Sequence, residues 1–200
     1  GFYIPGADAP ETDGPGGAVM LARAFYREGR ESEIWTDELC LSVMRAAAAA
    51  AGYPRRLVRT APPRLADESP DGLIFTERLG RAEDGGYYNF RKIDISAWTP
   101  PLDELAAEAK ERGIPTLGIG DGGNEVGMGN FHEELKRLLP AYASCLCTVR
   151  TDYALAVDVS NWGAYALTAA LSFMWGNWRG PEAGEELAML KAVKELGAVD

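Results

Sequence analysis

The feature that most constrains the fold is a glycine-rich segment that follows a strand-like run in the middle of the chain. Residues 114–119 resemble a buried strand, residues 120–129 contain five glycines, and a helical pattern begins near Phe131. Glycine allows the backbone to adopt a positive φ and to lie close to a ligand. A strand that leads through such a loop into a helix is typical of a site in an open α/β sheet.

The loop also carries polar groups. Asp121, Asn124 and Glu125 place two carboxylates and an amide on one tight turn. The loop lacks the Gly-Lys-Ser/Thr ending of a P-loop and the glycine spacing of a dinucleotide site. Its carboxylates would also repel a phosphate, which argues against nucleotide binding. A structural turn with solvated acids is the alternative, although a turn alone does not require two carboxylates crowded with an amide.

Strand-like and helical patterns alternate along the whole chain. Strand-like runs cover residues 2–4, 33–36, 56–59, 72–76, 114–119, 145–149 and 153–159. Helical patterns cover residues 15–28, 37–51, 102–112, 131–139, 162–175 and 182–196. This order predicts a three-layer α/β fold, in which helices cover both faces of a mainly parallel sheet of about five or six strands.

Composition limits the domain count and the classes of partner. A chain of 200 residues suits a single domain over residues 1–200. A net charge of −10 makes this an acidic protein and disfavours nucleic acid and anionic membranes as partners. No apolar run approaches the roughly 20 residues of a membrane span. Cys40, Cys145 and Cys147 lack metal-type spacing, which predicts buried free thiols in a reducing cytoplasm.

Three further segments follow strand candidates, and the first enters the helix that begins near Pro15. The N–H groups and the positive dipole end of that helix would suit a carboxylate or phosphate oxygen. A simple helix cap at Thr12 or Asp13 is the alternative, and a cap can also contact a ligand. The candidate ligand contacts in this turn are Glu11, Thr12, Asp13 and Gly14.

The second segment, residues 159–163, begins a helix with Ser160, Asn161 and Trp162. The first two of these are candidate ligand contacts or N-caps, and Trp162 is a candidate ligand contact or a core residue.

The third segment, residues 76–89, leaves a strand with Glu77, Arg78, Arg81 and Asn89. Because arginine pairs bidentately with carboxylates, Arg78 and Arg81 are candidate anchors for an acidic ligand. In a parallel sheet, loops that follow strands emerge at one edge. We therefore expect the loops 5–14, 77–89, 120–129 and 160–162 to face one cleft.

Four groups of residues resemble the D-glutamate cyclase C-terminal-domain family. They are residues 6–16, Glu77–Arg78 with Tyr87–Asn89, residues 118–130, and residues 160–163. The similarity spans nearly the whole chain, and the segment 118–130 is its most specific part. The resemblance implies a Rossmann-like fold and a lyase activity that converts D-glutamate to 5-oxo-D-proline and water.

The residues are compatible with that chemistry. Asp121 or Glu125 could act as the general base and the other as the acid, if burial and the neighbouring acid raise a pKa. Alternatively, the pair could hold Mg²⁺ or Mn²⁺; no organic cofactor is expected. Glycine N–H groups of the loop 118–129 could stabilise the developing oxyanion. Gly122, Gly123 and Asn124 of this loop are candidate substrate contacts. The expected partner is a small, glutamate-like acidic substrate.

Two other functions fit the same residues. A binding or regulatory domain could sense an acidic metabolite or nucleotide without turnover, and a metal-dependent hydrolase could use the same acids. A serine–histidine mechanism has no support, since the only histidine, His132, begins a helix and is expected to be a solvated or capping side chain. Stereochemistry, metal identity and oligomeric state stay open.

Overall fold

The computed structural model describes residues 1–65 and 68–199. Contacts between Cα atoms divide the chain into two compact units. Unit 1 consists mainly of Tyr3–Ala61 and Ser160–Asp200, and unit 2 mainly of Pro62–Val159. A single domain over residues 1–200 stays a prediction.

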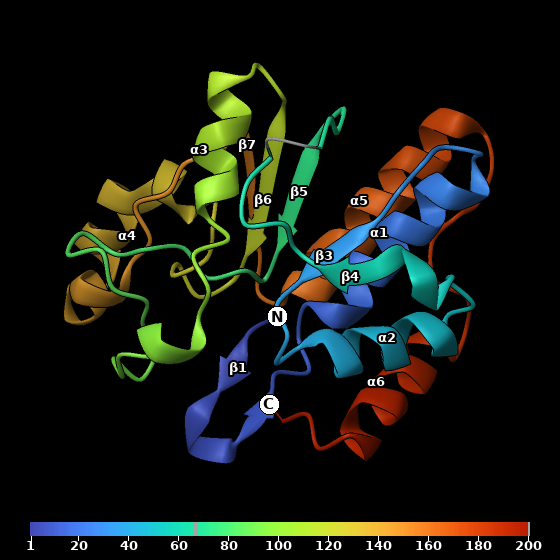
Figure 1. Cartoon of the computed structure of the whole chain (residues 1–200). Helices are drawn as coiled ribbons and strands as arrows, with labels where there is room; N and C mark the ends of the chain where they lie inside the picture. Colours follow the sequence, from blue (N-terminus) through green and yellow to red (C-terminus); the bar gives the residue numbers. More distant parts are fainter. Residues whose placement is uncertain (66–67, 200) are drawn as a thin grey trace. The chain divides into compact units, whose positions relative to one another are not determined.

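Unit 1 is built from helices and short strand pairs (Figure 1). β1 (Tyr3–Ile4) pairs antiparallel with β2 (Ala9–Pro10), and β3 (Ile34–Thr36) pairs parallel with β4 (Val58–Thr60). The helices of its described residues are α1 (Pro15–Arg27), α2 (Leu41–Ala50), α5 (Ser160–Trp175) and α6 (Glu185–Glu195), with short 3-10 turns at Pro5–Ala7 and Arg55–Leu57. α1 packs on α5, and α2 packs on α6.

Local sequence explains the limits of the helices in unit 1. Pro15, whose φ is fixed near the helical value, is the first residue of α1, and Gly29 follows its end with a φ of 73°. α2 begins at Leu41 rather than at residue 37, because the Asp37 carboxylate accepts a hydrogen bond from the Cys40 N–H (2.9 Å) and holds a turn before the helix. The hydrophobic core of unit 1 is formed by residues of α1, α2, β4 and α6, which include Val19, Met20, Val43, Met44, Val58, Met189 and Val193.

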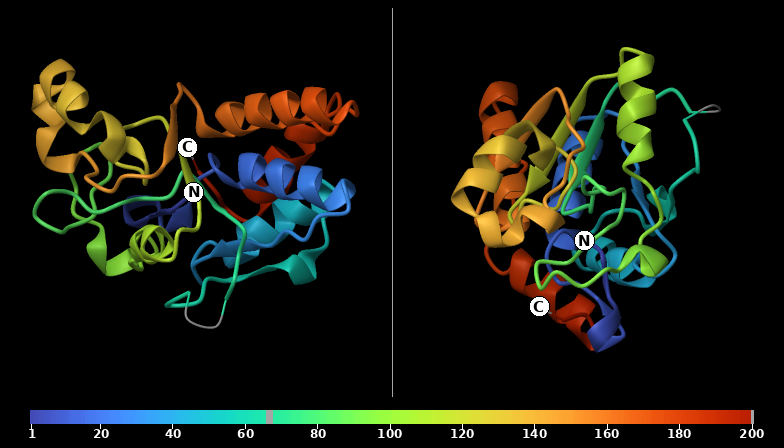
Figure 2. Two further views of the ribbon diagram at one scale, coloured as in Figure 1. Left: turned by 90° about the horizontal axis from the view of Figure 1, so that it is seen from above. Right: turned by 90° about the vertical axis from the view of Figure 1, so that its left-hand side faces the viewer.

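Unit 2 contains a parallel sheet in the order β5 (Leu73–Thr76), β6 (Thr116–Gly120), β7 (Tyr153–Ala156). α3 (Glu104–Glu111) and α4 (His132–Leu138) lie on opposite sides of this sheet in the right-hand view of Figure 2. Short 3-10 helices cover Ser96–Trp98, Met128–Phe131 and Pro140–Cys145. The predicted α/β class, with three layers, parallel strands and a Rossmann-like arrangement, is confirmed.

Two details of the predicted sheet are wrong. In the part of the chain that the structure describes, the strands form separate sheets of two, two and three strands instead of one sheet of five or six. Residues 145–149 form no strand, because their backbone bonds to the loops. Cys147 N–H donates to the Gly123 carbonyl (2.8 Å), and the Val149 carbonyl accepts from Gly127 N–H (3.0 Å). Within the described ranges, no helix is long and apolar enough to cross a membrane.

Candidate active site

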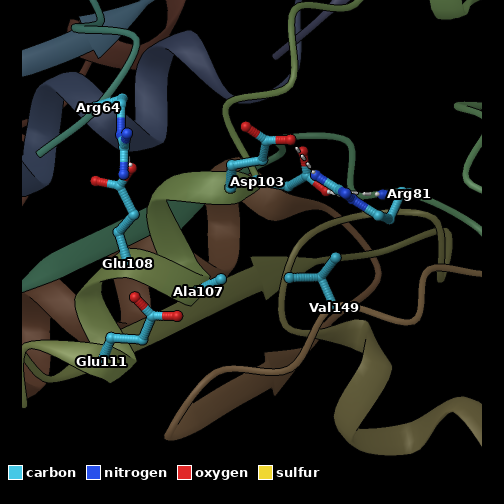
Figure 3. Close-up of a pocket in the computed structure, with 8 residues that line it drawn as sticks. Arg64, Arg81, Asp103, Ala107, Glu108, Glu111 and Val149 are labelled. Atoms are coloured by element: carbon cyan, nitrogen blue, oxygen red, sulfur yellow. Dashed lines mark hydrogen bonds and ion pairs between the residues drawn. The ribbon is translucent and has the colours of Figure 1, made fainter.

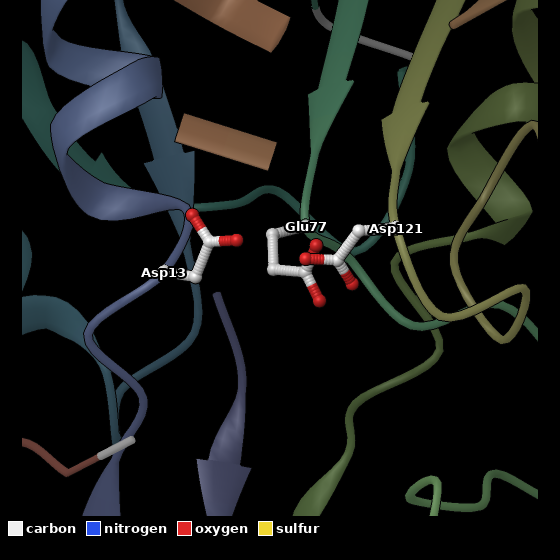
Figure 4. A group of neighbouring side chains, drawn as sticks. All are labelled: Asp13, Glu77 and Asp121. Carbon is white, nitrogen blue, oxygen red and sulfur yellow. The ribbon is translucent and has the colours of Figure 1, made fainter. Parts of the chain in front are cut away.

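Two carboxylates meet where neighbouring strands of unit 2 end. Glu77 follows β5 and Asp121 follows β6, and their side chains are drawn in Figure 4. A carboxylate oxygen of Glu77 lies within 4.8 Å of one of Asp121. Glu77 is buried and has a φ of 49°, in the left-handed region, which costs a non-glycine residue on the order of 1 kcal/mol. Such strain at a buried acid is typical of functional sites.

Glu125 turns its carboxylate back into its own loop. Its two oxygens accept hydrogen bonds from Gly122 N–H (3.0 Å) and Gly123 N–H (2.8 Å). Burial raises the pKa of Glu125, while these N–H groups and a hydrogen bond with the Glu77 carboxyl act in the opposite direction. Two carboxyl groups can form such a hydrogen bond only when one of them carries a proton.

Glycine is required where the loop closes over this carboxylate. A Cβ atom on Gly120 would lie 2.6 Å from a Glu125 oxygen, and one on Gly118 would collide with the Val126 carbonyl. The glycines therefore let the backbone wrap Glu125. The Gly122 and Gly123 N–H groups, expected to be free for an oxyanion, already donate to this side chain.

The loops 77–89 and 120–129 form one hydrogen-bonded assembly. Asn124 is buried, and its Nδ2 donates to the Tyr88 carbonyl (2.9 Å). Val126 N–H donates to the Arg78 carbonyl (2.7 Å). Asn89 instead shapes its own turn, since its Oδ1 accepts from the N–H groups of residues 91 and 93. The side-chain amides of Asn124 and Asn89 therefore both hold the backbone of the loop 77–93 in place.

The two arginines offered as substrate anchors contact groups of this chain. Arg78 is buried and donates to the Pro100 carbonyl (3.1 Å). Arg81 donates to Asp103 (2.7 Å) and Glu104 (3.1 Å), and these carboxylates raise its pKa. A substrate carboxylate would have to compete with both acids for Arg81.

Arg81 and Asp103 also line a surface cavity of about 620 Å³ along α3. Figure 3 shows Arg81 turned toward Asp103 at one end of this cavity and Arg64 beside Glu108 at the other. Because its lining holds more acids than arginines, with both arginines paired to acids, the cavity has no uncompensated positive charge for an acidic substrate.

In unit 1, Asp13 and Asn161 cap each other's helix. The Asp13 carboxylate, placed just before α1, accepts from the N–H groups of Ser160 (2.8 Å) and Asn161 (2.7 Å) at the start of α5, and from Gly14 N–H (2.8 Å). Asn161 Oδ1 accepts from the N–H groups of Gly14 (3.1 Å) and Gly17 (2.6 Å) at the start of α1. These acceptors satisfy N–H groups that a helix start leaves without a partner.

The other candidates in unit 1 are less enclosed. Glu11 forms a β-bridge with Val199, and Thr12 N–H donates to the Val199 carbonyl (2.8 Å). Trp162 is 59% exposed, so its interpretation as a core residue is wrong. Its Nε1 donates to Glu186 (3.2 Å) at the surface.

The predicted site residues therefore fall into two groups, each fixed within its own unit. Unit 1 holds Glu11, Thr12, Asp13, Gly14, Ser160, Asn161 and Trp162, and unit 2 holds Glu77, Arg78, Arg81, Asn89, Asp121, Gly122, Gly123, Asn124 and Glu125. A single cleft lined by all four loops stays a prediction.

Several features were missed or mistaken in the sequence. His132 is buried, and its ring nitrogens contact the Cys147 carbonyl (2.9 Å) and Glu83 (3.1 Å), so the expectation of a solvated or capping side chain is wrong. Asp103 is buried and binds both Arg81 and the Tyr87 hydroxyl. It precedes α3, where an aspartate normally indicates only a cap. The three cysteines are buried free thiols, as predicted.

Comparison with known proteins identifies the family to which this chain belongs. The family described as D-glutamate cyclase-like, C-terminal, matches residues 1–200. The human (Homo sapiens) protein named D-glutamate cyclase, mitochondrial, is 36% identical over 185 residues, a match covering 82% of this chain and 30% of the human protein. The chain thus spans less than a third of that relative's length. On its sequence, its fold and its glycine-wrapped acidic loop, this chain belongs to the D-glutamate cyclase-like C-terminal family.

Proposed function

We propose that this chain is a lyase that converts D-glutamate to 5-oxo-D-proline and water. The observation that carries the proposal is the group of three carboxyl side chains after β5 and β6. Asp121 is exposed, whereas Glu125 is buried with a raised pKa and hydrogen-bonded to Glu77. Carboxyl groups whose environments differ in this way are suited to separate acid and base roles. Family membership and the name of the human relative supply the reaction.

The reaction requires two proton movements. The α-nitrogen must lose two protons in total as it forms a bond to the carbon of the γ-carboxyl group. The departing γ-carboxylate oxygen must gain two protons as its C–O bond breaks and it leaves as water. Groups near the nitrogen must therefore accept two protons, and groups near the leaving oxygen must donate two.

We assign these roles by exposure. Asp121, the exposed carboxylate, accepts one proton from the substrate ammonium and passes it to the departing oxygen. The second proton lost by the nitrogen returns to the pair of Glu77 and Glu125. A proton on this pair reaches the departing oxygen through Glu77, because Glu125 is enclosed by its loop. Glu77 contacts Glu125 and lies near Asp121, so it joins the two functions. The strained backbone of Glu77 fixes its carboxyl for this role.

A divalent cation is a separate expectation. The carboxylates of Glu77 and Asp121 have the ligand chemistry that Mg²⁺ and Mn²⁺ prefer, whereas the oxygens of Glu125 are engaged by loop N–H groups. A bound cation would polarise the γ-carboxyl group of the substrate. For location, we propose the cytoplasm; the human relative is named as mitochondrial.

A non-catalytic domain that binds an acidic metabolite is the second candidate. It is favoured by one observation: the loop N–H groups and Arg81 form their hydrogen bonds within the chain. A metal-dependent hydrolase would use the same acids, but it would lose its activity in the presence of a chelator.

The test is formation of 5-oxoproline from D-glutamate and L-glutamate by the purified chain, with Mn²⁺ or with chelator. We expect product from D-glutamate with the unmodified chain and far less with Asp121→Asn. Asp71→Asn is the matched control, since Asp71 is an exposed acid that precedes β5, at the opposite end of that strand. Binding of intact D-glutamate without product under every condition would instead support the metabolite-binding domain.

A further inference from the structure

The helix α5 buries several polar side chains and exposes large apolar ones, the reverse of the usual arrangement. The side that faces the rest of unit 1 carries Asn161, Ala164, Thr168 and Ser172, all buried. The Thr168 hydroxyl donates a hydrogen bond to the Ala164 carbonyl (2.8 Å), and the Ser172 hydroxyl donates one to the Thr168 carbonyl (2.7 Å). These small residues allow close packing on α1, whose Gly17 would collide with the Ala164 side chain if it carried a Cβ atom (2.7 Å).

The opposite side of α5 is apolar and exposed. Trp162, Phe173 and Met174 are 59%, 89% and 77% exposed, and Ala166 and Ala170 lie exposed between them. At 100° per residue, Trp162, Ala166, Ala170 and Phe173 share one side of the helix. We call these four residues, together with the adjacent Met174, the α5 stripe. Residues 160–178 carry no charged side chain, although the chain has a net charge of −10.

The order of sizes along the α5 stripe is symmetric. Large side chains stand at both ends and alanines in the middle, and the Trp162/Phe173 and Ala166/Ala170 pairs have nearly the same midpoint, close to residue 168. A second α5 helix, antiparallel and related by a twofold axis at this midpoint, would place its large end residues beside those of the first. Ala166 would face Ala170 of the other copy, which allows the helices to approach closely.

The exposed area is sufficient for a weak dimer. Using about 150–250 Å² for each large side chain, the α5 stripe exposes roughly 500 Å² per chain. Two copies would bury about 1,000 Å², near the lower limit for a specific interface. Because the stripe is uncharged, the acidic net charge of each copy would oppose contact least along this helix. We propose that the α5 stripe is the interface of a symmetric homodimer, formed by antiparallel contact of two α5 helices.

The test uses the complete chain in sedimentation experiments from about 1 µM to 1 mM. We expect reversible dimerisation with a dissociation constant on the order of 1–100 µM, as for small interfaces. Ala166→Glu with Ala170→Glu should weaken it at least about 100-fold by placing like charges across the axis. Ala166→Lys with Ala170→Lys should do the same, and an equimolar mixture of the two variants should restore dimers. Leu138→Glu, at an exposed apolar position on α4, is the control and should dimerise like the unmodified chain.

Three results would overturn the proposal. They are a monomeric unmodified chain at every concentration, dimerisation of either charged variant alone at the unmodified strength, and a mixture that stays monomeric. The first result does not depend on any variant, so a substitution that disturbs folding cannot hide it. Circular dichroism of each variant separates loss of dimer from loss of fold.

Discussion

Asp13 in unit 1 and Glu125 in unit 2 have similar surroundings in the sequence but different surroundings in the structure. Each is an acid in a glycine-containing turn after a strand. The Asp13 carboxylate accepts from three backbone N–H groups and joins two helix starts. Glu125 accepts from two N–H groups and also bonds to Glu77, which lies beside Asp121.

The difference lies in the ratio of acids to donors. At Asp13, three backbone N–H groups donate to one carboxylate, which links the starts of α1 and α5. Around Glu125, three carboxyl groups gather, and burial raises the pKa of Glu125, which favours acid–base chemistry. A carboxylate in a glycine-rich turn therefore does not by itself indicate catalysis, because backbone N–H groups can account for its position.

The largest effect should come from the acids of unit 2. Asp121→Asn and Glu125→Gln should each lower turnover of D-glutamate roughly 10²–10⁴-fold, the usual contribution of a general acid or base. Asp121→Asn should leave stability within about 0.5 kcal/mol, since the side chain is exposed. Steady-state 5-oxoproline formation and urea unfolding measure the two quantities. Turnover at the parent rate in both variants would make these acids structural.

The second largest effect should be a loss of stability in the variant Asp13→Ala. The change leaves the N–H groups of Gly14, Ser160 and Asn161 without this acceptor, which should lower the free energy of unfolding by about 2–4 kcal/mol. Asp13→Asn keeps one acceptor oxygen and should lose less. Urea titration of the three proteins is the measurement. Equal stability of the alanine variant and the parent would remove Asp13 as the link between α1 and α5.

Gly118→Ala tests whether the loop around Glu125 depends on close backbone approach. The added methyl group would meet the Val126 carbonyl and the Gly127 Cα (2.7 Å), so we expect a loss of about 1–3 kcal/mol. The control is Gly6→Ala, where the new Cβ atom meets nothing within 4 Å. Thermal unfolding compares the two. A Gly118→Ala protein as stable as Gly6→Ala would show that the loop accommodates a side chain.

The smallest effect should be the pH dependence of an ion pair in unit 1. Arg23 is fully buried and binds Glu185 through two hydrogen bonds (2.6 and 2.8 Å), which lowers the pKa of Glu185 to about 2. The ion pair contributes on the order of 1 kcal/mol to the free energy of unfolding. This contribution is complete above the unfolded pKa of about 4.5 and is lost as the pH falls toward 2. The buried Glu125, whose pKa is raised, acts with the opposite sign.

Urea unfolding at pH 7 and pH 3 measures this dependence. The unmodified chain should lose more stability over this range than Glu185→Gln, in which the titrating group is absent. An identical pH dependence in both proteins would assign the acid sensitivity to other carboxylates.

Much of the secondary structure follows from local sequence, because its causes are local. Pro15 and Gly29 mark the limits of α1, and an apolar run predicts β6 to within a few residues. The run at residues 145–149 misleads for the same reason. Its composition fits a strand, but its backbone finds hydrogen-bond partners at Gly123 and Gly127, far away in the sequence. No periodicity in that run could indicate those partners.

The sequence by itself determined the α/β class and the buried thiols, since these depend on residue type and short-range pattern. It also predicts the acidic glycine loop as the place for chemistry. Only the tertiary structure decided which acid meets which donor. Asp13 bonds to residues more than 140 positions later, and Arg81 turns to Asp103. Such pairings depend on where the packed backbone places each group, because a hydrogen bond requires its atoms within about 3 Å.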